Sequence, residues 1–333
     1  MATLAGGHRD TPVVKEGIWI SAAEVIALPT HGPAWEALEA TSRKPIVPNL
    51  SDKDDPSNVR VLARAMVATR TGSVQAREEV LRALEEVQGT EVGARALAVS
   101  RGLMAYVVAA ELVGLNGPRR KKFDAWLRAM REQEFQGRTL RSTHEDRPNN
   151  WGTHAGASRL AVAIYLGDRL EVERAAWVFR GYIGDPSGWH DFKFGESWWQ
   201  PDNVCSEYGI NPAGAQIGQH PIGGVLPDDL RRGGPFRWPP PKENYVYEAL
   251  QGAVAQAVML ERQGMPAWDW GDKALLRAFE WLHEHADFPA TGDDTWIPHV
   301  VNRAYGTRFP APVPTRPGKG TGFADWTHGA SVP

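Results

Sequence analysis

The feature that most constrains the fold is a helical stripe that recurs along the chain. Apolar residues return at intervals of three and four within segments that are separated by short polar loops. These segments are residues 59–69, 75–88, 91–115, 119–134, 154–166, 170–182, 245–263 and 273–285. No stretch shows convincing alternation of the kind expected for a half-buried strand. The chain is therefore predicted to be all-α and to consist of successive helical hairpins.

Helical hairpins set side by side either extend as an open solenoid or close into a ring. A solenoid should show a repeat of fixed period in its sequence, and none is visible here. We therefore expect an α/α toroid, an incomplete barrel of helical hairpins, formed as a single domain by residues 19–333. Residues 1–18 are expected to be a loose N-terminal lead. Ser21 and Glu24 have the spacing of a capping box at the start of a first short helix.

One long segment, residues 183–244, interrupts the helical pattern. It is rich in Gly, Pro and Trp, and Gly233-Gly234 and Pro239-Pro240-Pro241 cannot lie inside a helix. Structureless segments of this length within a compact domain are usually functional. An earlier polar loop ends at Asn149-Asn150. Both loops precede a helix, whose N-terminal end favours anions, so we expect them to form the binding site.

Composition excludes several classes of protein. The formal net charge of -3 argues against a nucleic-acid partner. No run approaches the ~20 apolar residues of a membrane span. The single cysteine, Cys205, excludes an intrachain disulfide and a cysteine-rich zinc site. Apart from the pair His283/His285, no two histidines have ligand spacing with a carboxylate partner, so neither a metal nor another cofactor is expected.

The start of the chain lacks the layout of a signal peptide. The sequence therefore predicts a cytoplasmic protein, or a secreted or periplasmic one if a signal has been removed. Fourteen tryptophans are present, many of them beside Gly, Pro or Asp. Their flat faces suit stacking on sugar rings, although tryptophan also buries well at helix ends. Together with the Arg, Asn, His and Tyr residues of the two loops, they indicate a carboxylate-bearing substrate.

Three motifs carry a family resemblance. They are Asn149-Asn150-Trp151, then Gly-Val-Leu-Pro-Asp-Asp-Leu-Arg-Arg over residues 224–232, then Glu243-Asn244-Tyr245. With these motifs and with residues 19–24 and 49–52, the chain resembles the alginate lyase superfamily of polysaccharide lyases over nearly its whole length. The resemblance is closest to the glucuronan and alginate lyase branch, which is related to the poly-mannuronate lyases. Two departures are that Trp151 replaces the family's catalytic histidine and that the segment from Arg232 to Tyr245 is longer.

The resemblance implies cleavage of an anionic polysaccharide, glucuronan or alginate, by β-elimination. A base removes the C5 proton of a uronate, O4 departs, and a C4=C5 double bond forms. Asn150 and an arginine would hold the carboxylate, while Tyr245 would act as acid and base with His154 or His220 assisting. The expected catalytic residues are Asn150, His154, His220, Arg231 and Tyr245, and the expected substrate-binding residues are Asn149, Trp151, His190, Arg232, Arg237, Trp238, Lys242, Asn302 and Arg303. A monomer without a cofactor is expected.

Other interpretations of these residues remain open. Asn149-Asn150 could simply cap a helix, and Tyr245 could be an ordinary aromatic at a helix start. Asp228-Asp229 or Asp293-Asp294 could be the paired carboxylates of an α/α toroid hydrolase that acts on uronate oligosaccharides. A non-catalytic protein that binds acidic polysaccharides would need the tryptophans and arginines only. The aspartates of residues 49–58 are interpreted as a solvated surface, because the loop lacks the glycine and glutamate of an EF-hand.

Overall fold

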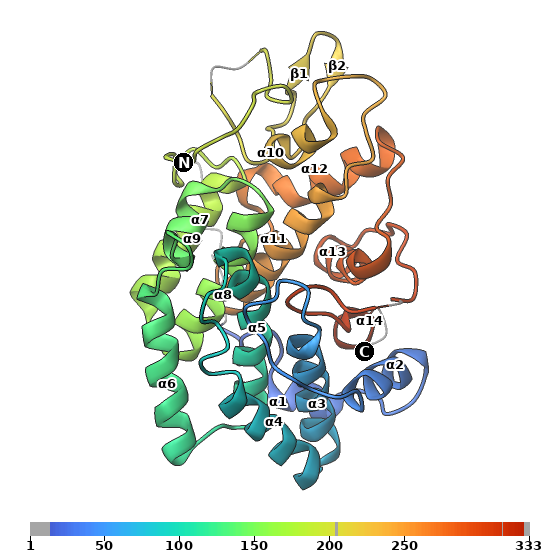
Figure 1. Cartoon of the computed structure of the whole chain (residues 1–333). Coiled ribbons are helices and arrows are strands. Elements are labelled where there is room, and N and C mark those ends of the chain that lie inside the picture. The colour runs from blue at the N-terminus through green and yellow to red at the C-terminus, as the bar shows by residue number, and fades with distance from the viewer. Residues whose placement is uncertain (1–13, 204–205, 315, 330–333) are drawn as a thin grey trace, which may run out of the picture.

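The chain folds almost entirely into helices. A computed structural model describes residues 14–203, 206–314 and 316–329, and within these it contains fourteen α-helices and one pair of two-residue strands (Figure 1). The helices are α1 (Ala22–Ala27), α2 (Pro33–Ser42), α3 (Ser57–Thr71), α4 (Val74–Glu86), α5 (Ala96–Leu112), α6 (Gly117–Glu132), α7 (Leu140–Asp146), α8 (Asn150–Tyr165), α9 (Arg169–Tyr182), α10 (Pro227–Leu230), α11 (Tyr245–Arg262), α12 (Trp270–Glu284), α13 (Ile297–Tyr305) and α14 (Ala324–Thr327). The prediction of an all-α fold is confirmed. Cys205 and residues 1–13 of the expected lead lie outside the described residues.

The positions at which the helices begin are set by local capping and turn residues rather than by the extent of the apolar stripes. Ser21 and Glu24 form the predicted capping box at the start of α1. α8 begins at Asn150, four residues earlier than predicted, because the Asn149 side chain accepts a hydrogen bond from the Trp151 amide. α5 begins five residues later than predicted because the preceding turns need positive φ at Gly89 and Gly93. α7, α10, α13 and α14 were not predicted, since they are too short for a clear periodic stripe.

Burial separates the helices into two kinds. α5, α8 and α11 are buried on nearly all sides, whereas α4, α6 and α12 bury one stripe and expose the rest. An alanine-rich helix that is apolar all round must be surrounded by other helices. The three fully buried helices are therefore the inner elements of the molecule, as their central position in Figure 1 illustrates.

The three inner helices and α3 begin at one end of the molecule. Asn58 in the first turn of α3 donates to the carbonyl oxygen of Arg101 in α5, and the Arg101 guanidinium pairs with Glu248 in the first turn of α11. His154, in the second turn of α8, lies against the backbone of Glu248. We call this end, formed by the first two turns of α3, α5, α8 and α11, the rim.

The order of neighbouring helices is compatible with a ring. α3 packs on α5, α5 on α8, α8 on α11 and α11 on α13, and α14 and α2 connect α13 back to α3. The toroid itself stays a prediction. Ile18, at the described end of the expected lead, is fully buried and its amide donates to Glu111 of α5. No described helix combines the length and apolar character that crossing a membrane requires.

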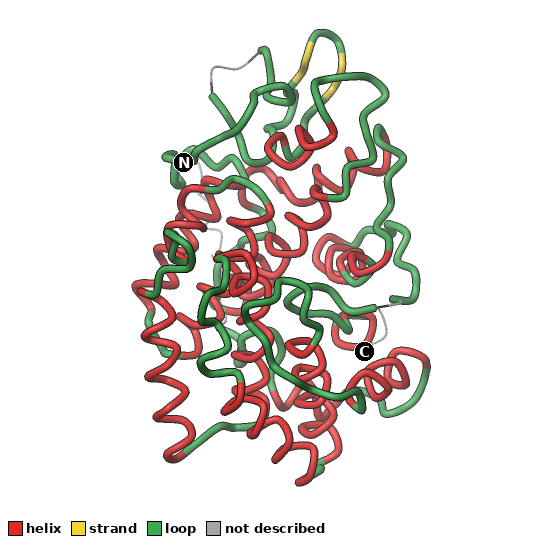
Figure 2. Tube along the Cα trace, viewed as in Figure 1, coloured by secondary structure: helices red, strands yellow, loops and turns green. Residues whose placement is uncertain are grey.

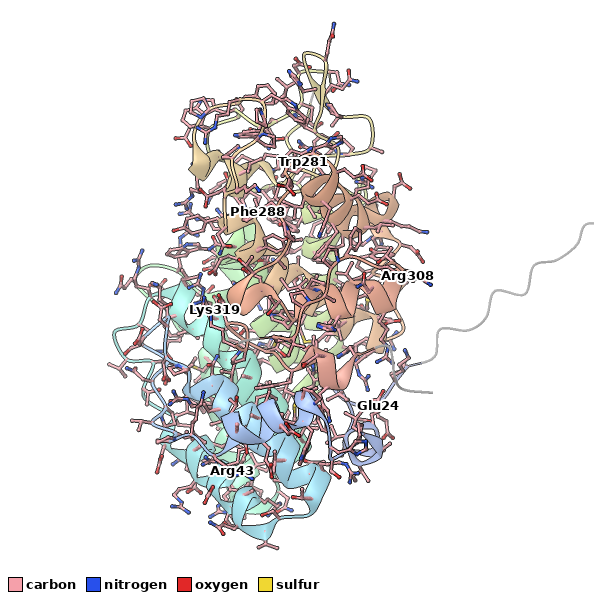
Figure 3. The ribbon with its side chains drawn as sticks, turned by 90° about the vertical axis from the view of Figure 1, so that its right-hand side faces the viewer. Glu24, Arg43, Trp281, Phe288, Arg308 and Lys319 are labelled. Atoms are coloured by element: carbon pink, nitrogen blue, oxygen red, sulfur yellow. The ribbon has the colours of Figure 1, made fainter. Side chains whose placement is uncertain are left out.

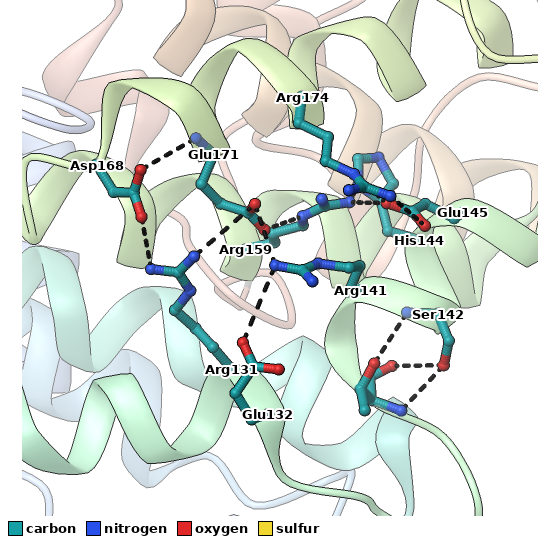
Figure 4. Close-up of polar contacts among 11 residues, drawn as sticks. Arg131, Glu132, Arg141, Ser142, His144, Glu145, Arg159, Asp168, Glu171 and Arg174 are labelled. Atoms are coloured by element: carbon teal, nitrogen blue, oxygen red, sulfur yellow. Dashed lines mark hydrogen bonds and ion pairs between the residues drawn. The ribbon is translucent and has the colours of Figure 1, made fainter.

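A buried ionic network fixes α8 against its outer neighbours (Figure 4). Arg159 of α8, which is 3% exposed, donates to Glu171 of α9 at 2.7 Å and pairs with Glu145 of α7 at 3.1 Å. Arg131 of α6 pairs with Asp168 at the start of α9. Because a buried charge without a partner is costly, this network holds α6 to α9 in one arrangement. It thereby fixes the direction in which α8 presents its N-terminal residues.

The long segment between α9 and α11 forms the irregular cap at the top of Figures 1 and 2. It contains the antiparallel pair β1 (Gln216–Ile217) and β2 (His220–Pro221), and then α10, which packs against α11. A 3₁₀ turn, Arg231–Gly233, follows α10 directly. The sequence predicted no strand here, because two-residue strands are too short to show alternation. The segment thus returns to the rim through α10.

Candidate functional site

Two of the predicted motifs dock directly onto each other at the rim. The Asn149 side-chain amide donates to the Asp228 carboxylate at 2.6 Å, and the Asn150 backbone N–H donates to Asp229 at 3.0 Å. All four residues are buried. The first turn of α8 is therefore fixed to α10 through two hydrogen bonds to neighbouring carboxylates.

Asp228 also anchors the long loop. One of its oxygens accepts from the Gly195 N–H at 2.7 Å and from Arg231 Nε at 2.8 Å. Arg231 makes a second ion pair with Glu196. The guanidinium of Arg231 is thus occupied by two carboxylates of the protein itself, so its contacts are those of a structural residue.

Asp229 lies in a different electrostatic setting from its neighbour. It is 1% exposed, and burial, reinforced by the nearby Asp228 charge, raises its pKa well above the ordinary value. Its Oδ2 has no hydrogen-bond partner within the part of the chain that the structure describes. Asp229 is therefore a neutral carboxyl in the folded protein across the acidic range in which free aspartate ionises.

The Asn150 side-chain amide is buried without a hydrogen-bond partner in the described structure. Asn150 is 1% exposed, yet neither atom of its side-chain amide is hydrogen-bonded to any described residue. Buried amides normally have partners, so an unpaired one is a candidate donor to a bound molecule. The neighbouring Asn149 is the opposite case, because both ends of its amide are used by the protein.

Arg232 and Tyr245 form the second part of the site. The guanidinium carbon of Arg232 lies 5.0 Å from the centroid of the Tyr245 ring, and both residues are exposed. In residues 14–203, 206–314 and 316–329, Arg232 has no ion pair. Asn150 contacts Asp229, and Arg232, which contacts Tyr245, follows Asp229 by three residues. One short segment of the chain therefore connects Asn150 with Tyr245. α8 and α11 also begin at the same end, so the structure brings Asn150, Arg232 and Tyr245 to the rim.

His154 lies near this site but faces the interior. It is 3% exposed, and its ring is hydrogen-bonded to the backbone of Glu248 in the first turn of α11. Burial, with the neighbouring charges of Arg101 and Lys319, lowers the pKa of His154 well below its ordinary value. The ring is therefore neutral near pH 7, and its contacts fix α8 against the helix that carries Tyr245.

Trp151, which replaces the family's histidine, is partly exposed at the rim. The guanidinium carbon of Arg95, at the start of α5, lies 5.2 Å from the centroid of its ring. This cation–π contact is a second pair of an arginine and an aromatic ring at the rim, after Arg232 and Tyr245, and it lies next to Asn150. Arg95 was not predicted as a site residue, because its position beside Trp151 depends on the packing of α5 against α8.

The structure places other predicted residues in the outer part of the long loop. His220 stacks on Trp238 with ring centroids 4.7 Å apart, and Lys242 pairs with the exposed Asp287 at 3.0 Å. His190 is exposed after α9, where its ring contacts the carbonyl oxygen of Pro186. Arg237 is also exposed on this loop. Among the described residues of the loop, no contact links any of these predicted residues to Asn150 or Tyr245.

Asn302 and Arg303 lie away from the rim. Asn302 closes the C-terminal turn of α13 by accepting from Thr307 and Phe309, and Arg303 donates to the carbonyl oxygen of Thr327. Arg303 lines a pocket together with Arg262, the last residue of α11. The structure therefore places both residues at the opposite end of the inner helices from Asn150, because α13 runs parallel to α11.

A charged cluster at the rim was missed by the sequence analysis. It comprises Arg101, Glu248, Asp54, Lys319 and Asp293, joined by ion pairs across the starts of α3, α5, α11 and α13. One signal was present, since Arg101 is one of only two charged residues in the alanine-rich helix α5. Glu248 lies in α11, the remaining members come from three separate loops, and nothing in the sequence indicates that they meet. No group of His, Cys, Asp and Glu in the described residues has the arrangement of a metal site.

Taken together, these features define an all-α protein whose inner helices present amide, guanidinium and phenol groups at one rim. The model of the family described as alginate lyase matches residues 82–185, about a third of the chain. The match includes Asn149 and Asn150 but ends before Arg232 and Tyr245. It supports the relationship to the alginate lyase superfamily and to polysaccharide lyases of that type. No curated protein matches the chain significantly.

Proposed function

We propose that this protein is a polysaccharide lyase that cleaves a uronic-acid polymer, glucuronan or alginate, by β-elimination. The observation that carries the proposal is the free Arg232 guanidinium over the ring of Tyr245, at the same rim as the unpaired amide of Asn150. The family match over residues 82–185 supports the class of reaction.

The first task of such an enzyme is to stabilise the uronate carboxylate while the C5 proton is removed. Negative charge builds on the carboxylate as an enolate-like state forms. The Asn150 amide can donate a hydrogen bond to it and Arg232 can pair with it, and both contacts strengthen as the charge grows. One such donor typically contributes about 3 kcal/mol to transition-state stabilisation.

The second task is proton transfer. Tyr245 would take the C5 proton as phenolate and return a proton to O4 as the glycosidic bond breaks. The Arg232 guanidinium lies over the ring that carries this phenol. General acid–base catalysis of this kind typically contributes ~10²–10⁴-fold to the rate. His154 would support the reaction from beneath the site through its contact with Glu248, and Trp151 would stack on a sugar ring.

A hydrolase is the second candidate, and one observation favours it. Burial raises the pKa of Asp294 to about 7, which is the property expected of a general acid. However, Asp294 is 1% exposed and accepts a hydrogen bond from Gln251 at 2.8 Å. The Asp294 carboxyl is thus already engaged by the protein, whereas the Asn150 amide has no partner among the described residues, so we favour the lyase.

The test is incubation of the wild-type protein with poly-mannuronate, poly-guluronate, glucuronan and a neutral glucan. A lyase produces ultraviolet absorbance from the conjugated C4=C5 double bond on a uronate polymer. Tyr245→Phe should abolish the absorbance. The variant should still bind the polymer, so its migration should still be retarded in an affinity gel that contains the polymer. New reducing ends without absorbance would instead establish a hydrolase. Binding without either product would establish a carbohydrate-binding protein.

A further inference from the structure

An aspartate at the rim faces three cations. Asp54 lies in the loop before α3, and its side chain is 53% exposed. Its Oδ1 is 3.5 Å from Lys319 Nζ and 3.8 Å from a terminal nitrogen of Arg101, and its Oδ2 accepts from Lys53 Nζ. These cations hold the pKa of Asp54 below its ordinary value, with the hydrogen bond from Lys53 lowering it most.

Arg101 connects this cluster to the proposed catalytic site. It is 5% exposed and pairs with Glu248, which follows Tyr245 by three residues on α11. Three residues of an α-helix advance by about 4.5 Å, so Glu248 and Tyr245 lie on one face within a turn of each other. The three cations therefore lie beside the place where a uronate would react.

Lys319 is held in place by its backbone. Its N–H donates to Gln251 Oε1 of α11 at 2.8 Å, and its carbonyl oxygen accepts from the Asn58 side chain of α3. The glycines on both sides pass close to inner residues. A Cβ at Gly318 would meet Trp296 Nε1 at 2.3 Å, and one at Gly320 would meet the Arg101 carbonyl oxygen at 2.9 Å. Figure 3 shows Lys319 above the N-terminal helices drawn in blue.

The Lys319 ammonium group has no short partner in the described structure. Its distances to Asp54 and Asp293 are 3.5 and 3.4 Å, which are ion-pair contacts longer than a good N–H···O hydrogen bond. Its side chain is 25% exposed. Its pair with Asp54, whose side chain is 53% exposed, can be exchanged for another carboxylate at little cost, because ion pairs with solvent-exposed carboxylates contribute only ~0–1 kcal/mol.

We propose that Lys53, Arg101 and Lys319 form a binding position for the carboxylate of the uronate next to the cleaved one, and that Asp54 occupies this position in the free protein. The inference rests on the proposed lyase function and extends it to a second sugar. Each uronate of the polymer carries one carboxylate, so a neighbouring ring requires a neighbouring cationic position. Asp54 gives up this position when the polymer binds by moving its side chain alone, because its loop is anchored by Leu50, which is 2% exposed and donates its N–H to Thr90.

The test compares Asp54→Asn, Lys319→Met and Lys319→Arg with the wild-type enzyme on the cleaved polymer. Asp54→Asn removes the competing charge and keeps the side-chain shape, so KM should fall about two- to fivefold. Lys319→Met should raise KM about tenfold or more, since a hydrogen bond to a charged group is lost, and Lys319→Arg should restore most of the binding. Asp124→Asn, which removes the same charge from a surface pair on α6, is the matched control.

Affinity is measured separately from turnover. Calorimetry with uronate oligosaccharides in a Tyr245→Phe background should show the same order of affinities. A KM for Asp54→Asn that equals or exceeds that of the wild type overturns this inference alone, because the enzyme still cleaves its polymer. A wild-type protein that neither cleaves nor binds any uronate polymer overturns the proposed function and this inference together.

Discussion

The side-chain amide of Asn149 donates a 2.6 Å hydrogen bond to the carboxylate of Asp228, although the two residues are 79 positions apart in the chain. This contact joins the first turn of α8 to α10. It also explains why the two sequence motifs occur together, because each supplies half of one buried junction. The Asp228 carboxylate also accepts hydrogen bonds from the Gly195 N–H and from Arg231. The Asp228 carboxylate therefore ties both α8 and the long loop to α10.

Replacement of Asp228 by alanine should destabilise the protein strongly. It leaves the buried Asn149 amide unpaired and removes one of the two carboxylates that Arg231 contacts, so we expect a loss of about 3–5 kcal/mol in the free energy of unfolding. Urea denaturation measures the change. Glu196→Gln, which removes the exposed partner of the same arginine, should cost less than about 1 kcal/mol and serves as the control. Equal effects from the two variants would contradict the central position of Asp228.

The two adjacent arginines, Arg231 and Arg232, should have different functions. Arg232→Ala should lower kcat/KM about a hundredfold or more, since it removes the free guanidinium beside Tyr245, with little change in stability. Arg231→Ala should act mainly on stability, because its charge is already paired with Asp228 and Glu196. Kinetics on the cleaved polymer and urea midpoints, measured for both variants, check this. Loss of activity confined to Arg231→Ala would assign the carboxylate contact to the first arginine.

The contrast between Arg231 and Arg232 is an example of what the sequence alone does not predict. The helical stripes predicted the long helices, and the motifs predicted that Asn150 and Tyr245 belong to one site. The choice between Arg231 and Arg232 could not be predicted, because identical neighbours differ only in the direction that a 3₁₀ turn gives them. His154 was ambiguous for a related reason: α8 is buried on nearly every side, so its apolar pattern does not show which residue faces the rim. Lys319 and Asp54 meet across 265 positions, and no local pattern encodes such a contact.

The two adjacent asparagines should likewise differ, with Asn150 affecting activity and Asn149 affecting stability. Asn150→Ala should reduce kcat about a hundredfold while the protein unfolds at nearly the same urea concentration, because its side-chain amide has no partner in the described structure. Asn149→Ala removes both the N-cap of α8 and the bond to Asp228, so it should cost about 1–2 kcal/mol or more of stability. A stability loss at Asn150 as large as that at Asn149 would indicate a structural amide at both positions.

Asp229 should make the folded protein less stable as pH rises. Burial raises its pKa above that of the unfolded chain, so between the two values the folded state binds the extra proton. Stability is then highest below the unfolded pKa of about 4 and decreases as pH increases towards the folded pKa. Asp229→Asn retains an oxygen that can accept the Asn150 N–H and cannot ionise, which removes this decrease.

The measurement for Asp229 is the difference in unfolding free energy between Asp229→Asn and the wild type at pH 4, 6 and 8. Other groups with shifted pKa values, such as His144 and Asp294, titrate in both proteins and cancel in the difference. The variant should gain stability relative to the wild type with each increase in pH. A difference that stays constant from pH 4 to pH 8 would show that Asp229 ionises in the folded protein as it does in the unfolded chain. Asp229 would then be an ordinary charged residue beneath the first turn of α8.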